Sequence, residues 1–333
     1  SQAVSIALGA IGGAEALAAL GAARAGATGL RLSAIETAWL RAAESLGNDA
    51  AAQAAYNAAY ASPTPRLKAA GLLGLARTTG NAALPLIDAA LRGDDWDLAT
   101  AALRALLLVP GAAANQILAD ALPALTPLIA AQALRTVGER GDVALQPAVL
   151  ALLGNADEGI TLAALRTLTK IGDGAIVGPV AALAGGAEGP VQNAARLTLA
   201  QAPNEAIDQA ILAGLGAAQG TQREEMVRAL AVRRSPAAVQ ALAQVIANDA
   251  DEGARLTALE ALTALASPDE LPVLVGALTR ATSDAERAAA EAAVAATVVR
   301  TDDTALRAQA LLAALPNATG ATRAAVLRVL GLT

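Results

Sequence analysis

The sequence predicts an all-α fold, a right-handed α-solenoid (superhelix) of about ten stacked helix-hairpin repeats. Two observations lead to this prediction: turn residues recur at a nearly constant interval, and the composition contains almost no aromatic rings. Of the 333 residues 55% are hydrophobic, yet the chain has two Trp, two Tyr and no Phe. A core of Ala, Leu, Val and Ile suits closely packed helices better than a sandwich or barrel, which would use aromatic and β-branched strands.

The length of the chain favours an elongated array. A single compact core stops growing at roughly 250 to 300 residues, so 333 residues imply either two domains or an extended repeat protein. No stretch rich in Pro, Ser or charge divides the sequence, and its hydrophobic rhythm does not change. We therefore predict a single continuous array over residues 1–333, with a lone terminal helix at about 320–332.

Each hairpin is marked by the residue that opens its internal turn. These residues follow one another at intervals of 30 to 35 positions: Gly13, Asn48, Gly80, Gly111, Gly141, Asp173, Asn204, Ser235, Ser267 and Asp302. Gly, Asn, Asp and Ser either accept left-handed backbone geometry or cap the helix that follows. Every mark thus has a physical cause in the turn.

Two amphipathic helices surround each mark. In residues 158–172, Leu165 and Leu168 lie on one helical face, and after Gly174 a second helix carries Ile176 and Val180 at helical spacing. Neither helix buries its apolar stripe alone. Stacking one hairpin on the next buries both stripes, which makes the array quasi-one-dimensional.

The repeats resemble HEAT-like repeats, in the short form of about thirty residues associated with phycobilisome lyases. The segments that carry the resemblance are ALRTLTKIGDGAIVGPVAAL, ALEALTALASPDELPVLVGAL and AAGLLGLARTTGNAALPLIDAAL. The resemblance covers essentially the whole chain. It implies a solenoid that serves as a scaffold or adaptor and only occasionally as an enzyme.

The composition argues against an enzyme and against a metal or other cofactor. The chain has no His and no Cys, which excludes an imidazole base, a Ser-His-Asp triad, a thiol nucleophile and a thiolate metal site. The HEAT-like metal-dependent hydroxylases use His-Glu pairs, so that enzymatic branch of the resemblance is ruled out. Carboxylate pairs could still perform acid-base chemistry.

The net charge and the hydropathy of the chain argue against nucleic acids and membranes as partners. A net charge of −6 argues against a nucleic-acid binder, which needs a clear excess of Lys and Arg. No uninterrupted apolar run reaches the 18 residues of a transmembrane helix, so no membrane span is predicted. The compartment stays open, with a lean towards export because the sequence begins with Ser1 rather than a methionine and contains no Cys.

The most informative pattern is a column of charged residues at one repeat position. It consists of Arg104, Arg135, Arg166, Arg196 and Arg228, followed by Glu260 and Glu291, at intervals of 30 to 32 residues. One interpretation is an inherited repeat consensus with solvated side chains that contribute little. The other is a track for an acidic segment of a protein partner or another polyanion.

The four aromatic residues lie in the first third of the chain. Tyr56 and Tyr60 are four residues apart and coincide with core positions Ile87 and Leu91 of the next repeat, so we expect them to fill a wider core layer rather than to stack on a ligand. Trp96 stands at a helix start among aspartates and is the better candidate for contact with a partner.

Acidic turns precede several first helices, at residues 93–95, 155–159 and 248–253. A Ca²⁺ loop would need a bidentate acid further along the chain, and none stands there. We expect the aspartates to cap helix N-termini, where a negative charge is favourable.

The ends of the array carry apolar side chains. Val326, Leu327 and Leu330 lie on the terminal helix without a second helix to cover them, and residues 3–13 form a short apolar helix without charge. Such ends can stack on one another, and repeated stacking gives a filament. The alternative is that the chain is a part of a longer array whose further repeats cover these ends.

Three functions follow from these features. The leading one is a non-catalytic scaffold or adaptor that binds a protein partner along an extended surface. The alternative is a structural subunit that self-assembles end to end into a filament or sheath. A lyase-type enzyme is the weaker alternative, suggested by the resemblance alone.

Overall fold

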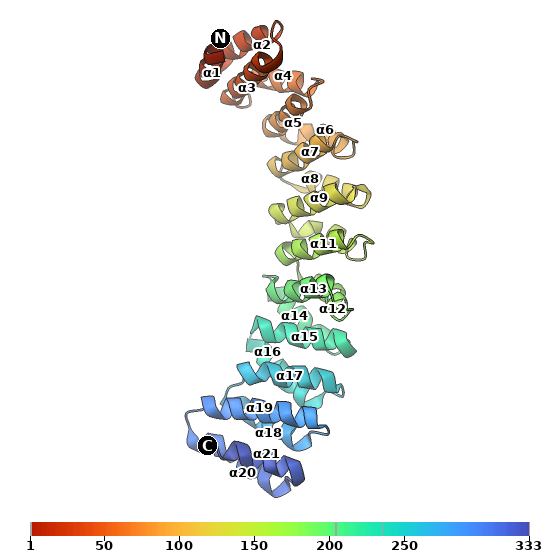
Figure 1. Cartoon of the computed structure of the whole chain (residues 1–333), viewed down its shortest axis with the longest axis vertical. Helices are drawn as coiled ribbons and strands as arrows, with labels where there is room; N and C mark the ends of the chain where they lie inside the picture. Colours follow the sequence, from red (N-terminus) through yellow and green to blue (C-terminus); the bar gives the residue numbers. More distant parts are fainter. Residues whose placement is uncertain (1, 204, 235, 333) are drawn as a thin grey trace. The chain divides into compact units, whose positions relative to one another are not determined.

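In the computed structural model the chain consists of α-helices joined by short turns and 3-10 segments, and no strand occurs among residues 2–203, 205–234 and 236–332, which the structure describes. The expectation of an all-α solenoid is confirmed (Figure 1). The chain divides into two compact units, residues 1–167 and 168–333. One uninterrupted array over residues 1–333 stays a prediction.

The first unit alternates first and second helices of successive hairpins. Its first helices are α1 (Gln2–Ile11), α3 (Gly29–Ser45), α5 (Pro65–Thr79), α7 (Trp96–Leu108), α9 (Pro127–Arg140) and the greater part of α11 (Glu158–Ile171). Its second helices are α2 (Gly13–Arg24), α4 (Ala50–Tyr60), α6 (Leu84–Leu91), α8 (Ala112–Ala121) and α10 (Gln146–Leu150), and the 3-10 segments are η1 (Gly80–Ala83), η2 (Leu122–Ala124) and η3 (Val143–Leu145).

The second unit repeats this alternation. Its first helices are α13 (Pro190–Gln201), α15 (Gly220–Arg233), α17 (Glu252–Leu265), α19 (Asp284–Arg300) and α21 (Gly320–Leu330). Its second helices are α12 (Val177–Ala184), α14 (Glu205–Gly214), α16 (Pro236–Asn248), α18 (Leu271–Arg280) and α20 (Thr304–Ala314), and the 3-10 segments are η4 (Gly174–Ile176), η5 (Pro268–Glu270) and η6 (Leu315–Asn317).

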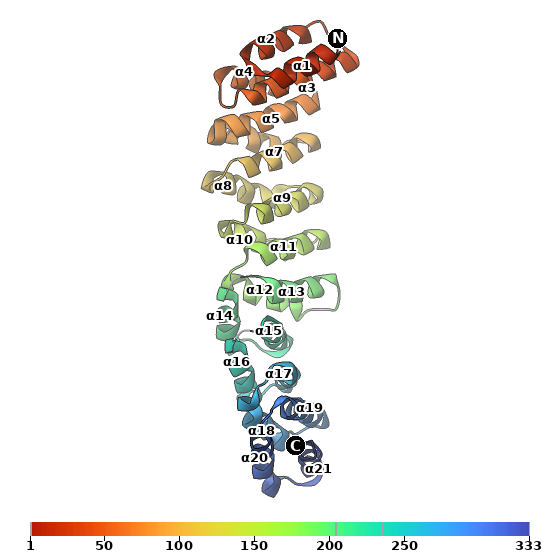
Figure 2. The same cartoon turned by 90° about the vertical axis from the view of Figure 1, so that its left-hand side faces the viewer.

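Within each unit the first helices form one layer and the second helices another (Figure 2). Small side chains let neighbouring helices of one layer approach closely. At Gly9 of α1, an added Cβ would lie 2.8 Å from the Cα of Ala38 on α3. An Ala-rich composition without large rings is therefore what this packing requires.

The turns are formed by the residues that mark them in the sequence. Gly80, Gly111 and Gly141 all have positive φ, which an L side chain rarely adopts. The Asp173 and Ser267 side chains instead accept backbone N–H bonds at the start of the next segment. The marks at Asn204 and Ser235 lie outside the described residues.

Arginines at the ends of first helices join successive repeats. Arg140 donates to the carbonyl oxygens of Leu106 and Val109 at the end of the preceding first helix. Arg233 makes the same connection to Leu199 and Ala202. The last carbonyls of a helix have no partner within it, so these bonds satisfy buried acceptors and fix the stacking of the hairpins.

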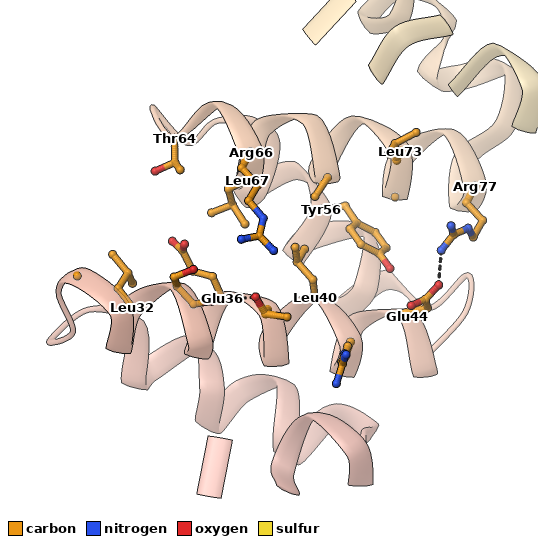
Figure 3. A pocket seen from close by; sticks show the side chains of 16 residues that line it. Leu32, Glu36, Leu40, Glu44, Tyr56, Thr64, Arg66, Leu67, Leu73 and Arg77 are labelled. Atoms are coloured by element: carbon orange, nitrogen blue, oxygen red, sulfur yellow. Dashed lines mark hydrogen bonds and ion pairs between the residues drawn. The ribbon is translucent and has the colours of Figure 1, made fainter. Parts of the chain in front are cut away.

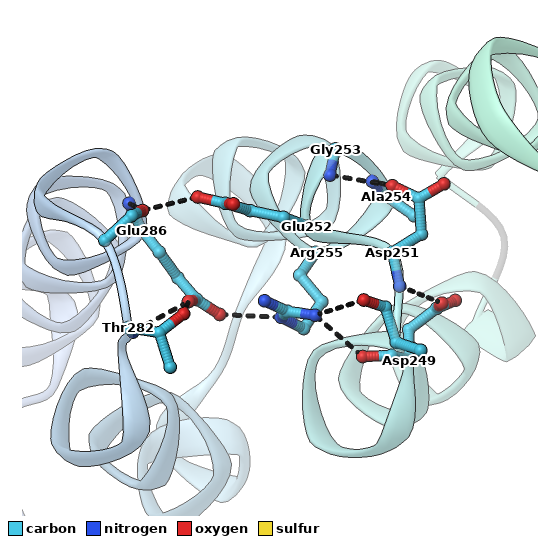
Figure 4. Close-up of polar contacts among 10 residues, drawn as sticks. Asp249, Asp251, Glu252, Gly253, Ala254, Arg255, Thr282 and Glu286 are labelled. Atoms are coloured by element: carbon cyan, nitrogen blue, oxygen red, sulfur yellow. Dashed lines mark hydrogen bonds and ion pairs between the residues drawn. The ribbon is translucent and has the colours of Figure 1, made fainter.

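A further polar network crosses from α17 to α19 (Figure 4). Arg255 donates from Nε to the Glu286 carboxylate at 2.7 Å and from Nη1 to the carbonyl oxygen of Asp249 at 2.8 Å. The backbone N–H of Thr282 donates to the second oxygen of Glu286 at 3.2 Å. These bonds, above all the one from Arg255, hold the pKa of Glu286 below its ordinary value of 4.5.

This lowered pKa predicts a loss of stability in acid. Between the folded pKa of Glu286 and 4.5 the unfolded chain binds more protons than the folded chain, so stability falls as the pH drops through that window. In urea unfolding monitored by circular dichroism, we expect wild type to lose more stability between pH 6 and pH 3 than Glu286→Gln, which lacks this titration. Equal losses in the two proteins would contradict the assignment.

Candidate functional site

A groove opens between α3 and α5 in the first unit (Figure 3). Its volume is about 580 Å³, within the range of known ligand and peptide pockets. Leu32 and Leu40 on α3 face Leu67 and Leu73 on α5, and Tyr56 of α4 lies between the two helices. We call this the α3/α5 groove.

The groove arises because α5 packs on α4 rather than on α3. An added Cβ at Gly74 would lie 2.1 Å from the Tyr56 ring, and one at Gly71 would lie 2.4 Å from the backbone nitrogen of Tyr60. Because glycine has no side chain, α5 packs closely on α4 at these two positions. By contrast, α3 and α5 contact each other at few residues. Neighbouring first helices, such as α1 with α3 and α5 with α7, pack directly.

The charged side chains of the groove fall on both walls. Glu44 of α3 and Arg77 of α5 form an ion pair of 2.5 Å that connects the walls at one end. Glu36 of α3 pairs with Arg24 at 3.7 Å. Arg66 of α5 points across the groove and has no hydrogen bond or ion pair within the described chain (Figure 3).

Tyr56 is buried, with 4% of its surface exposed, and so fills a core layer as the sequence predicts. Its hydroxyl reaches the groove. Burial and, to a smaller extent, the charge of Glu44 raise the pKa of Tyr56, against the opposing effect of Arg77. Tyr56 is therefore a neutral phenol that can donate a hydrogen bond to an occupant of the groove.

The repeat pattern of the sequence does not predict this groove. A constant repeat interval implies that all first helices pack alike. The gap between α3 and α5 departs from this pattern because Gly71 and Gly74 of α5 pack closely against Tyr56 of α4. The available signal is the segment AAGLLGLA, which has two Gly residues in a helix interior one hairpin after a Tyr.

The column arginines occupy one equivalent site on successive first helices, but their surroundings differ. Arg104, Arg135 and Arg166 in the first unit are exposed, and Arg135 pairs with Glu139 at 3.6 Å in its own helix. In the second unit Arg228 is exposed, whereas Arg196 is half-buried and bonded to Glu225 of the next first helix. Arg196 therefore has a structural role.

Trp96 lies at the start of α7 with 49% of its surface exposed. It lines a pocket of about 540 Å³ together with Leu125 and Ile129. Its role in binding stays a prediction.

The acidic turns cap helices, as the sequence predicts. Asp95 accepts from the N–H of Leu98, and Asp251 accepts from Gly253 and Ala254 at the start of α17 (Figure 4). No group of three His, Cys, Asp or Glu side chains able to hold a metal ion occurs in the part of the chain that the structure describes.

The candidates for self-association on α21 need a correction. Val326 is completely buried, and α21 packs against α18, α19 and α20. It therefore offers no surface to another molecule, and its inclusion among the end contacts is wrong. Leu327 is 50% exposed, and Leu330 is half-buried.

Comparison with known proteins supports the fold. Residues 194–295 match the family profile of HEAT repeats, which confirms the resemblance noted in the sequence. A comparison with curated protein sequences finds no match.

Among solved structures, Kap121p bound to Nup53p is similar over 95% of this chain and 41% of Kap121p, with 13% identity and a TM-score of 0.55. Kap121p bound to Ste12p is similar over the same shares, with 12% identity and a TM-score of 0.54. The chain thus spans less than half the length of Kap121p, and this likeness shows the solenoid fold alone. The complex of CpcE and CpcF of phycocyanin lyase from Nostoc is a more distant match, with 16% identity over 84% of this chain and 93% of that one, and a TM-score of 0.34.

Within the described residues, no helix combines the length and the apolar character needed to cross a membrane.

Proposed function

We propose that the protein is a non-catalytic scaffold that binds a protein partner, and that a segment of this partner occupies the α3/α5 groove. The observation that supports this proposal is an accessible apolar groove of about 580 Å³ with charged walls in a HEAT-like solenoid. Apolar grooves with a few placed polar groups are the usual sites for peptide segments. The fold likeness to Kap121p, which is bound to other proteins in its structures, agrees with such a role.

The groove defines the chemistry of its occupant. The leucines on both walls favour aliphatic side chains, and the phenol of Tyr56 supplies a hydrogen bond. Arg66 has no partner within the described chain, so an acidic residue of the occupant would form a charge-assisted pair with it. The partner segment is therefore aliphatic with at least one acidic residue.

A charge placed in the groove tests this proposal. Leu73→Glu puts a carboxylate where the occupant would bury its apolar surface, and we expect affinity for the partner to fall at least about tenfold. The matched control is Leu107→Glu, since Leu107 is an exposed leucine on α7 outside the groove.

The measurement is affinity capture from the native source followed by isothermal titration with the captured partner. We expect wild type and Leu107→Glu to capture a common set of proteins, and Leu73→Glu to lose one or more of them. Retention of the same proteins by all three, with equal affinities, would contradict a role of the groove.

End-to-end self-association is a second candidate function. It is supported by the exposed side chains of Val4, Ile6 and Ile11 on α1 and of Leu327 on α21. Light scattering of purified protein tests it: we expect concentration-dependent particles that Leu327→Glu reduces. A monodisperse monomer at high concentration would contradict self-association. The lyase alternative rests on the family resemblance alone.

A further inference from the structure

An apolar depression interrupts the solvent-facing surface of two first helices in the second unit. Leu197 on α13 and Val232 on α15 are 51% and 59% exposed. With Ala200 and Ala229 they line a depression of about 300 Å³, whose rim includes Arg196 and Arg228. Two neighbouring exposed aliphatic side chains beside charged ones offer the apolar contact and the polar rim that a bound segment uses.

The two arginines share a single buried carboxylate. Arg196 donates to both oxygens of Glu225, from Nε at 2.8 Å and from Nη2 at 2.6 Å. Arg228 lies on the same helix as Glu225, and its Nε is 3.5 Å from the nearer oxygen. Arg228 approaches Glu225 most closely through its Nε, so the exposed guanidinium keeps its terminal nitrogens available for an external carboxylate.

The sign of the column changes at the next first helix. Glu260 on α17 follows Arg228 at the equivalent site, is exposed, and has no ion pair or hydrogen bond within the described residues. Packed first helices are about 8 to 10 Å apart, a distance that about three residues of extended chain span. A segment lying across α13, α15 and α17 would therefore meet an apolar depression, then a positive group, then a negative one.

We propose that this surface binds an extended protein segment that carries an aliphatic side chain beside an acidic one, with a basic side chain about three residues further on. The aliphatic group enters the depression, the acid pairs with Arg228 and the base pairs with Glu260. A nucleic-acid strand does not fit, because Glu260 would repel its phosphates. This site is distinct from the α3/α5 groove and uses none of its residues.

A peptide array tests the proposal with defined probes. It contains twelve-residue peptides with the aliphatic–acidic–basic pattern in both chain directions, the same peptides with acid and base exchanged, and peptides with Ser in place of the aliphatic residue. The fluorescently labelled full-length chain is the ligand in solution. We expect the proposed pattern to bind about tenfold more tightly than the exchanged one, and the Ser peptides to bind several-fold more weakly.

Variants of the protein make the assignment specific. Arg228→Gln should abolish the preference for the acid, and Glu260→Arg should convert the preference for a base at the far position into one for an acid. Both side chains are exposed, so folding should be retained, which circular dichroism verifies. The matched control is Arg135→Gln, because Arg135 is an exposed column arginine that likewise pairs within its own helix but lies outside the depression.

Several results would overturn the proposal: binding of no peptide, equal binding of the proposed and exchanged patterns, or an unchanged preference in Glu260→Arg. Tighter binding of a single-stranded oligonucleotide than of any peptide would overturn it as well. Leu73→Glu should leave binding to the peptides unchanged, because Leu73 lies in the α3/α5 groove. A result that overturns the proposal for this surface is therefore distinguishable from one that overturns the proposal for the groove.

Discussion

We expect Gly71→Ala to lower the free energy of unfolding of the first unit by about 3 kcal/mol, the upper part of the usual range for overpacking. The added Cβ would lie 2.4 Å from the backbone nitrogen of Tyr60 and 2.7 Å from the carbonyl oxygen of Tyr56. Backbone atoms of α4 cannot turn aside as a side chain can, so α5 must move away from α4. The same movement would disturb the α3/α5 groove.

The matched control is Gly178→Ala in α12, where an added Cβ meets nothing within 4 Å. That substitution should raise stability by about 0.5 to 1 kcal/mol, because Ala restricts the unfolded chain and favours helix. Trp39 and Trp96 are the only two tryptophans, and both lie in the first unit, so tryptophan fluorescence during urea unfolding reports on Gly71→Ala. For Gly178→Ala, circular dichroism measures the urea unfolding. An unchanged midpoint for Gly71→Ala would show that α4 and α5 are not in close contact.

We expect Arg255→Ala to destabilise the second unit by about 3 kcal/mol, the range found when one partner of a buried ion pair is removed. The substitution leaves the buried Glu286 carboxylate without its strongest donor. It also removes the bond to the carbonyl oxygen of Asp249, which connects α17 with the preceding turn (Figure 4). The hairpins on either side of α17 should then unfold together more easily.

A double substitution separates the ion pair from the packing. Arg255→Met with Glu286→Leu removes both charges and should recover most of the loss, because an apolar pair of similar volume is often as stable as a buried ion pair. Arg92→Ala is the control, since its pair with Asp88 is exposed and should contribute less than about 1 kcal/mol. Urea unfolding by circular dichroism measures all three. A loss for Arg255→Ala as small as that for Arg92→Ala would contradict the structural role of the network.

Local chemistry made much of the fold predictable. Gly80, Gly111 and Gly141 need positive φ and Asp173 caps the next segment, so the hairpin turns can be located from the sequence. The connections between hairpins could not be located in this way. Arg140 and Arg233 satisfy carbonyls about one repeat earlier, and nothing in a single repeat distinguishes them from solvated surface arginines.

The candidate sites were predictable only in part. The repeat interval places the column arginines at one helical site, but Arg196 pairs with a glutamate on the next first helix and Arg228 does not, a difference that depends on tertiary packing. The sequence places Val326 on a free end face, yet the structure buries it, because helical periodicity alone does not say which apolar face meets the preceding hairpin. The α3/α5 groove depends on Gly71 and Gly74 meeting α4, which no periodic pattern reveals.

Site-specific photo-crosslinking tests the central claim, that a protein segment occupies the α3/α5 groove. In cells that produce the protein, a benzophenone amino acid replaces either Thr64, which lies at the rim of the groove, or Leu107, which lies outside it. The cells are then irradiated to form the crosslinks. We predict a discrete crosslinked partner from position 64, absent from position 107 and lost when Leu73→Glu is added. Identical crosslinks from both positions, or a crosslink from position 64 that Leu73→Glu leaves unchanged, would contradict it.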